Sequence, residues 1–167
     1  MVLPHRRHGK GRSALSPPPG RAHAGRMATI DGRTSLEFLS VPACWSLLAS
    51  IPVGRIGVLN DSAPEIYPVN YVVVDHTIAF RTDIGSKLSA LDRSPAVCFQ
   101  VDEIDPESST GWSVLVKGRA SLVKDPGERR YLDAQGLREW SLGHKAHWVR
   151  VVAAEVTGRR IWSRPGN

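Results

Sequence analysis

After residue 50 the sequence alternates between apolar and polar residues over short stretches, which is the pattern of half-buried β-strands. Turn-forming residues separate these stretches: Asn60 to Ala63 and the pair Asp75-His76 predict two hairpin turns, and residues 105–111 predict a polar loop. Six strands are therefore expected, at residues 53–59, 65–74, 77–81, 96–101, 112–123 and 147–162. Short connections of this kind favour antiparallel pairing.

Three short segments show helical spacing instead of alternation. Residues 41–49 predict the first helix, with Ser40 as its N-cap and Pro42 in its first turn. A second helix is expected directly after the polar loop 82–87. The third is expected over residues 126–140, where apolar side chains gather on one side.

These elements predict a mainly β domain with short helices. About six short antiparallel strands curl and close instead of staying flat, so a small six-stranded antiparallel β-barrel is expected. The 167 residues suit one domain, and no stretch repeats at a fixed period. No glycine-rich phosphate loop follows a predicted strand, which argues against Rossmann and P-loop nucleotide sites.

Charge is distributed unevenly along the chain. The formal net charge is +6, but residues 1–26 hold six Lys and Arg and no acidic residue, so residues 27–167 are neutral with 16 of each sign. The first segment is rich in Gly, Pro and His and predicts a disordered basic tail. Two interpretations stay open: a tail that contacts nucleic acid or a membrane surface, or an upstream extension with the true start at Met27. Residues 27–167 are expected to form the folded domain.

Apolar runs and cysteines restrict the class of protein further. Hydrophobic residues make up 41% of the chain, and no run approaches a membrane-spanning length. Cys44 and Cys98 lie far apart without a paired motif, so neither a disulfide framework nor a zinc site is expected. His144 and His147 have no third ligand nearby in the sequence, and we predict no metal site. A reducing cytoplasm is the expected location.

One segment combines cations and hydroxyls where a predicted strand ends and a helix begins. Arg81 and Thr82 end the strand, and Ser86 and Lys87 begin the helix. Amides at a helix N-terminus together with these side chains suit a phosphate monoester. The alternative is that Arg81 and Lys87 are solvated loop charges and Thr82 is a cap, which composition alone favours.

A polar residue also interrupts the apolar strand at residues 65–74. Alternation places Pro68 and Asn70 on one face of that strand, and Tyr67, Val69 and Tyr71 on the other. Pro68 has no amide hydrogen, which indicates an edge position or a bulge. Asn70 either contacts the polar rim of a planar heterocycle or bonds a neighbouring strand.

The order of these motifs resembles that of the flavin-binding split β-barrel proteins, which are the pyridoxamine 5′-phosphate oxidase-like proteins. The likeness is to their small actinobacterial and nitroimidazole-reductase-like branch. It covers residues 34–162 and is carried by Pro68-Val69-Asn70-Tyr71, by Phe80-Arg81-Thr82 with Gly85-Ser86-Lys87-Leu88, by Val97 to Asp102, and by Gly111-Trp112-Ser113-Val114 with Val116 to Ala120.

This resemblance implies a homodimer that holds two molecules of flavin mononucleotide (FMN) in clefts between the subunits. The family pattern assigns the phosphate to Arg81, Thr82, Ser86 and Lys87. It assigns the isoalloxazine ring to Pro68, Val69, Asn70 and Tyr71, and the completion of the pocket to Trp112 and Ser113, although Trp112 equally suits a core position. The implied activity is hydride transfer to or from a small organic substrate, in which no side chain has to act as acid or base.

Two departures restrict what the resemblance implies. Arg81 stands where many nitroimidazole-reductase-like relatives carry histidine, so an activity that requires that histidine is not expected. The substrate-binding Arg and His pattern of true pyridoxamine phosphate oxidases is not apparent at residues 158–162, so vitamin B6 oxidation is not expected either. Two alternatives remain: a reductase of the same barrel class that uses the deazaflavin F420, and a non-catalytic carrier of flavin or haem.

Overall fold

The computed structural model describes residues 30–31, 35–61, 63–83, 91, 94–138 and 145–163 of the chain. Its elements in chain order are β1 Ile30–Asp31, β2 Leu36–Phe38, α1 Val41–Ser50, β3 Val53–Asn60, β4 Ala63–Val74, β5 Thr77–Thr82, β6 Ala96–Asp105, β7 Thr110–Leu122, α3 Pro126–Asp133 and β8 His147–Ile161. The basic tail and the helix predicted after residues 82–87 lie outside the described residues, except for the buried Leu91 of that helix.

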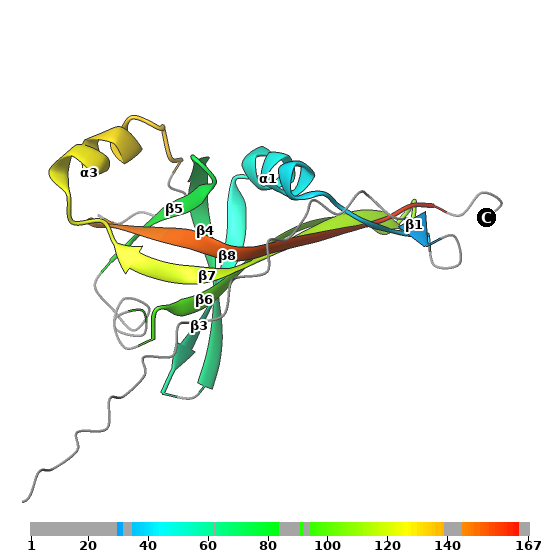
Figure 1. The fold of residues 1–167 in the computed structure, drawn as a ribbon, viewed down its shortest axis with the longest axis horizontal. Coiled ribbons are helices and arrows are strands. Elements are labelled where there is room, and N and C mark those ends of the chain that lie inside the picture. The colour runs from blue at the N-terminus through cyan, green and yellow to red at the C-terminus, as the bar shows by residue number, and fades with distance from the viewer. Residues whose placement is uncertain are drawn as a thin grey trace, which may run out of the picture.

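Six of the strands pair into a closed barrel, whose arrangement in space is drawn in Figure 1. The pairing order β8-β5-β4-β3-β6-β7 returns to β8 through an additional pairing of β7 with β8, and all these ladders are antiparallel. Ile56, Phe80 and Phe99 are fully buried inside it. The turn at Asp75-His76 has φ angles of 49° and 56°, the two-residue geometry that matches the twist of the flanking strands. The prediction of a six-stranded antiparallel barrel is confirmed.

β8 is long enough to belong to two parts of the molecule. Its first residues pair with β5 and its last three with β2, while β7 runs along its other side through both parts. Figure 1 shows β7 and β8 continuing beyond the barrel towards β1. We call this extension, residues 36–38, 103–113 and 158–162, the arm. The hydrophobic pattern does not predict β1 and β2, because strands of two and three residues are too short to show an alternation.

α1 lies against the barrel and begins and ends as predicted. The Ser40 side chain accepts a hydrogen bond from an amide of the first turn, which contains Pro42. On the inner face of the helix Leu48 is fully buried. The hydroxyl of Tyr71 on β4 donates a hydrogen bond to the backbone carbonyl of Leu48, so a buried polar contact ties the helix to the barrel.

The buried Tyr71 hydroxyl should make stability depend on alkaline pH. Burial raises the pKa of Tyr71 above its ordinary value near 10. The contribution of this group is therefore complete below about pH 10 and is lost as the pH rises towards the folded-state pKa. Above about pH 10, the free energy of unfolding should fall by about 1.4 kcal/mol per pH unit more in the wild type than in Tyr71→Phe. Urea denaturation of both proteins between pH 8 and 11 measures this difference, and parallel curves would contradict it.

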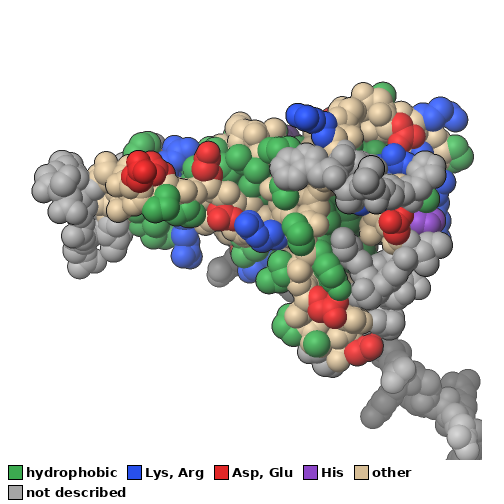
Figure 2. All heavy atoms as spheres, turned by 180° about the vertical axis from the view of Figure 1, so that it is seen from behind, with side chains coloured by type: hydrophobic (Ala, Val, Ile, Leu, Met, Phe, Trp, Pro, Cys, Tyr) green, Lys and Arg blue, Asp and Glu red, His purple; other side chains and the backbone are tan. Residues whose placement is uncertain are grey.

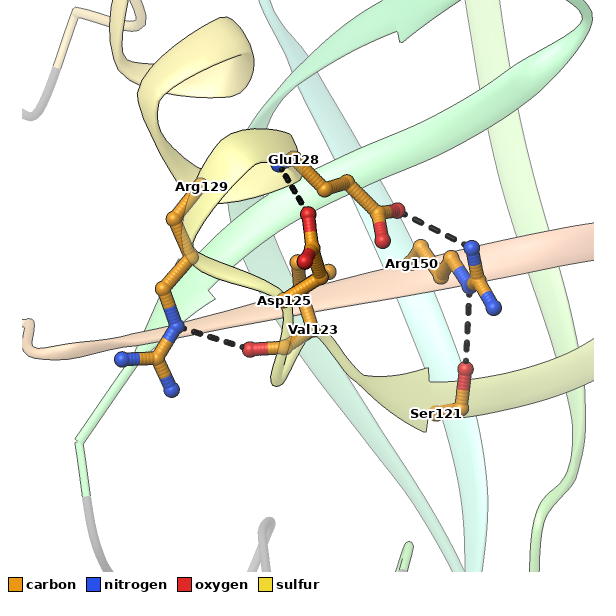
Figure 3. Close-up of polar contacts among 6 residues, drawn as sticks. All are labelled: Ser121, Val123, Asp125, Glu128, Arg129 and Arg150. Carbon is orange, nitrogen blue, oxygen red and sulfur yellow. Dashed lines mark hydrogen bonds and ion pairs between the residues drawn. The ribbon is translucent and has the colours of Figure 1, made fainter.

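α3 crosses the outside of the sheet and covers a second, smaller core. The buried members of this core are Ala79, Val123, Leu132 and Trp148. The helix begins at Asp125, whose Oδ1 accepts the Glu128 amide at 2.7 Å. Figure 3 shows how the same turn is fixed to the sheet: Glu128 pairs with Arg150 of β8 at 3.0 Å, and Arg129 donates to the Val123 carbonyl at 2.9 Å.

The prediction that this helix continues to residue 140 is wrong in its second half. α3 ends at Asp133, and Gly136 adopts a φ of 70°, which a right-handed helix does not contain. The apolar pattern continued to Leu137 because that side chain packs against the second core from the segment after the helix. The pattern therefore predicted the burial of Leu132 and the packing of Leu137 correctly, but not the helix length or the 50% exposure of Tyr131.

Membrane-spanning helices and cysteines can both be checked in the described residues. Neither α1 nor α3 has the length and the apolar content that crossing a membrane would require. Cys44 and Cys98 are both free thiols, Cys44 buried in the core and Cys98 exposed.

Candidate functional site

Arg81 and Asn70 lie on adjacent strands and on the same outer face of the barrel. The β4–β5 ladder ends with the pair of Tyr71 and Phe80, and Asn70 and Arg81 are the residues directly beyond this last pair on the two strands. Tyr71 and Phe80 are buried in the core, and alternation turns Asn70 and Arg81 to the opposite face. The structure therefore places a cation and an amide, taken from two separate sequence motifs, next to each other.

The Arg81 side chain packs on an aromatic ring. Arg81 on β5 pairs with Trp148 on β8, and the guanidinium carbon lies 5.6 Å from the centre of the indole. Trp148 is 3% exposed and belongs to the second core under α3. Stacking on a buried ring restricts the guanidinium, whose planar donors suit the oxygens of a phosphate.

The other predicted phosphate ligands divide between described and undescribed residues. Thr82 is 5% exposed, and its hydroxyl lies 3.4 Å from the backbone carbonyl of Asp83. Alternation turns it to the inner face, opposite to Arg81. Ser86 and Lys87 lie outside the described residues. Arg81 and Thr82 thus both lie at the end of β5, but their side chains point to opposite faces of the strand.

The β4 residues on either side of Asn70 alternate between buried and exposed positions, as the sequence pattern predicts. Val69 and Tyr71 are buried, and Tyr71 packs edge-to-face on Phe99 at 4.8 Å. Pro68 is exposed and pairs with Arg55 of β3, whereas the β4–β5 ladder reaches only as far as Tyr71. Pro68 therefore has a strand neighbour on one side within the described ladders, which confirms the edge position that its missing amide hydrogen indicated.

Trp112 and Ser113 lie in the arm, far from Arg81 in the same chain. Trp112 pairs with Arg160 of β8, whereas Arg81 pairs with Trp148, so twelve residues of β8 separate the two positions. At about 3.3 Å per residue, the length of β8 between these two positions is roughly 35–40 Å, which is longer than an FMN molecule. One chain alone therefore does not bring all the predicted ligands to one cofactor.

Trp112 borders a cleft of the arm. The cleft has a volume of about 490 Å³, and Trp112, Trp162, Ile104, Ile161 and Arg160 are among its lining residues. The indole nitrogen of Trp112 donates to Glu103 at 3.1 Å, and the side chain is 9% exposed. Figure 2 shows hydrophobic side chains between charged ones along the arm. Trp112 is thus mostly buried, as a core position requires, and it also borders this cleft, while its place in the cofactor pocket stays a prediction.

A polar cluster beside Pro68 was not predicted as part of the site. Arg55 on β3 is hydrogen bonded to Asp102 on β6 at 2.7 Å, and Gln100 donates to the same carboxylate oxygen at 2.8 Å. Arg55 pairs with Pro68 on one side and with Gln100 on the other. Arg55 and Gln100 interrupt apolar strands as Asn70 does, and that shared signal would have marked these two residues, whereas Asp102 directly follows the predicted strand 96–101.

Comparison with known proteins identifies similar chains. A family model described as pyridoxamine 5′-phosphate oxidase matches residues 40–160. The Mycobacterium tuberculosis protein Rv0080 is 42% identical in an alignment of 128 positions that covers 69% of this chain and 78% of that protein. The matched residues extend from α1 to β8 and include the whole barrel.

Solved structures agree with this match. The structure of the FAD binding protein from Mycobacterium smegmatis is 39% identical, with a TM-score of 0.65 over 75% of this chain and 98% of that one. A conserved protein of unknown function from Corynebacterium diphtheriae is 34% identical, with a TM-score of 0.65 over 76% and 98%. The fold is therefore the split β-barrel of these proteins.

Proposed function

Because the chain belongs to the pyridoxamine 5′-phosphate oxidase family, we propose that it binds FMN and acts as an oxidoreductase on a small organic substrate. The chemistry at the site supports this proposal. Arg81 offers a guanidinium fixed on an indole, and Asn70 offers an amide on the adjacent strand. These two groups suit the phosphate and the polar heterocycle of the cofactor, respectively. The similarity to the FAD binding protein from Mycobacterium smegmatis supports a flavin in the same barrel.

In this proposal the residues of the chain bind and orient the cofactor. Arg81 holds the phosphate together with Ser86 and Lys87, and Thr82 supports the strand end. Asn70, the backbone from Pro68 to Tyr71, and the Arg55–Gln100–Asp102 cluster lie along the heterocycle. Flavin, when bound, supplies hydride transfer, and hydrogen-bond donors of the protein adjust its electronics. No side chain is assigned as acid or base.

We also propose that the site is shared between two copies of the chain in a homodimer. The separation of roughly 35–40 Å between Arg81 and Trp112 along β8 supports this arrangement. The arm carries exposed apolar side chains, with Ile104 at 60% and Trp162 at 47% exposure. A partner that covers the arm would bury these side chains and bring its own Trp112 and Ser113 to the first protomer's Arg81.

Two other cofactors are the alternatives to FMN. FAD is favoured by the name of the 39% identical relative. F420 also carries a phosphate that Arg81 and Lys87 would bind.

The proposed compartment is the cytoplasm, where free thiols such as Cys44 and Cys98 stay reduced. Pyridoxamine phosphate is not the proposed substrate, because the arginine and histidine pattern expected near the end of the chain is not apparent.

Purified full-length protein should be yellow. We expect an absorbance maximum near about 450 nm, and mass spectrometry of the heat-released ligand should give the mass of FMN. A maximum near about 420 nm would identify the deazaflavin, and the mass of FAD would identify the dinucleotide. A Soret band would indicate haem. Failure of all these cofactors to co-purify or to bind at micromolar concentration would overturn the proposal.

A further inference from the structure

We propose that Trp148 and Asp133 are positioning residues that hold the Arg81 guanidinium in its phosphate-binding orientation. The proposal rests on the proposed function, since it concerns how that site keeps its cation in place. It assigns a role in the site to the end of α3, an element that contributes none of the predicted ligands.

Trp148 is held by two hydrogen bonds. The backbone carbonyl of Trp148 accepts the Val123 amide at 2.9 Å, and the indole nitrogen donates to Oδ1 of Asp133 at 2.8 Å. Asp133 is the last residue of α3. The backbone contact fixes the strand, whereas the contact with Asp133 fixes the rotation of the ring, which has no other polar group.

Packing adds to this restraint from the sides. Trp148 packs with Ala79, Val123 and Leu132, and only 3% of it is exposed. A ring with this little free space has one orientation, so its face directed at Arg81 does not change. The interaction of a cation with an aromatic ring depends on the cation lying over the face, here at 5.6 Å.

α3 itself is anchored independently at its other end. The Asp125 cap and the pair between Glu128 and Arg150 hold its first turn (Figure 3). These contacts lie at the start of the helix, whereas Asp133 lies at its end. The two ends can therefore be altered separately, which allows the positioning role of Asp133 to be distinguished from a general contribution to stability.

The test compares FMN with riboflavin, which lacks the phosphate. For the full chain we measure the affinity of each by fluorescence titration and take their ratio as the phosphate preference. Asp133→Leu should lower this ratio by about three- to tenfold, because the ring and the cation on it lose their fixed orientation. Asp133→Asn keeps an oxygen acceptor for the indole and should stay within about twofold of the wild type.

Glu128→Gln is the matched control for the helix. It weakens the ion pair at the start of α3 without touching Trp148, so the thermal midpoint falls and the phosphate preference stays. An Asp133→Leu protein that folds and keeps the wild-type preference would overturn the positioning role. Equal loss of preference in Glu128→Gln would also overturn it, because stability alone would then explain the effect.

A second readout does not depend on any flavin. In ¹⁵N-correlated NMR spectra, the side-chain Nε–H signal of Arg81, assigned by its loss in Arg81→Lys, should broaden or shift in Asp133→Leu and not in Glu128→Gln. If the wild type shows no preference for FMN, the proposed function fails, and this signal still decides whether Asp133 positions Arg81. An unchanged Arg81 signal in Asp133→Leu would exclude the positioning role.

Discussion

Arg81→Ala should weaken FMN binding by about 10- to 100-fold and leave riboflavin binding within about twofold. A hydrogen bond between a guanidinium and a phosphate contributes about 1.5–3 kcal/mol, and riboflavin carries a neutral hydroxyl in place of the charged phosphate. The expected result follows from the position of Arg81 beside Asn70 and on the Trp148 ring. Fluorescence titration of both ligands measures the two affinities.

Arg81→Lys separates charge from geometry. Lysine keeps the positive charge, but it has neither the planar donors nor the same stacking on the indole, so its affinity for FMN should lie between those of the wild type and Arg81→Ala. Raising the ionic strength should reduce the difference between FMN and riboflavin in the wild type. Equal losses for FMN and riboflavin in Arg81→Ala would mean that Arg81 supports the fold and does not contact the phosphate.

A mixed dimer should recover binding that both parent proteins have lost. Arg81→Ala and Trp112→Leu homodimers each have two defective sites if one protomer supplies Arg81 and the other supplies Trp112. In a heterodimer of the two variants, one site combines both substitutions and the other combines two wild-type residues. We therefore expect about one FMN per heterodimer at near wild-type affinity, against about two per wild-type dimer.

Co-expression with two different affinity tags isolates the heterodimer for this experiment. Binding stoichiometry is measured by titration, and thermal unfolding of each homodimer checks that the mostly buried Trp112 can be replaced without unfolding the arm. A heterodimer as defective as its parents would place the complete site within one chain. A protein that stays monomeric by light scattering at all cofactor concentrations would exclude the shared site directly.

Much of the barrel could be predicted because its residues report burial locally. Alternation along β4 separates Asn70 from Tyr71 by face, and the structure shows the same separation. The start of α1 was predictable for a similar reason, since Ser40 and Pro42 act within one turn of the chain.

The parts that could not be predicted depend on contacts between distant residues. Trp148 becomes the partner of Arg81 only through the register of β5 with β8, which no local pattern reports. The arm is hidden for the same reason, since β2 exists only because the last residues of β8 lie beside it. The separation of Arg81 and Trp112 along β8 follows from that register as well, so residues that the family resemblance assigns to one cofactor lie far apart within one chain.

β8 comes last in chain order among the six barrel strands, and it also closes the barrel. β8 pairs with β5, β7 and β2, and these partners are made earlier during synthesis. During synthesis on the ribosome, β5 and β7 therefore keep exposed edges until β8 has left the exit tunnel and can pair with them. Premature termination within β8 would leave a chain that has most of its core residues but lacks the strand that pairs with the β5 and β7 edges. Such fragments would be prone to aggregate through these edges.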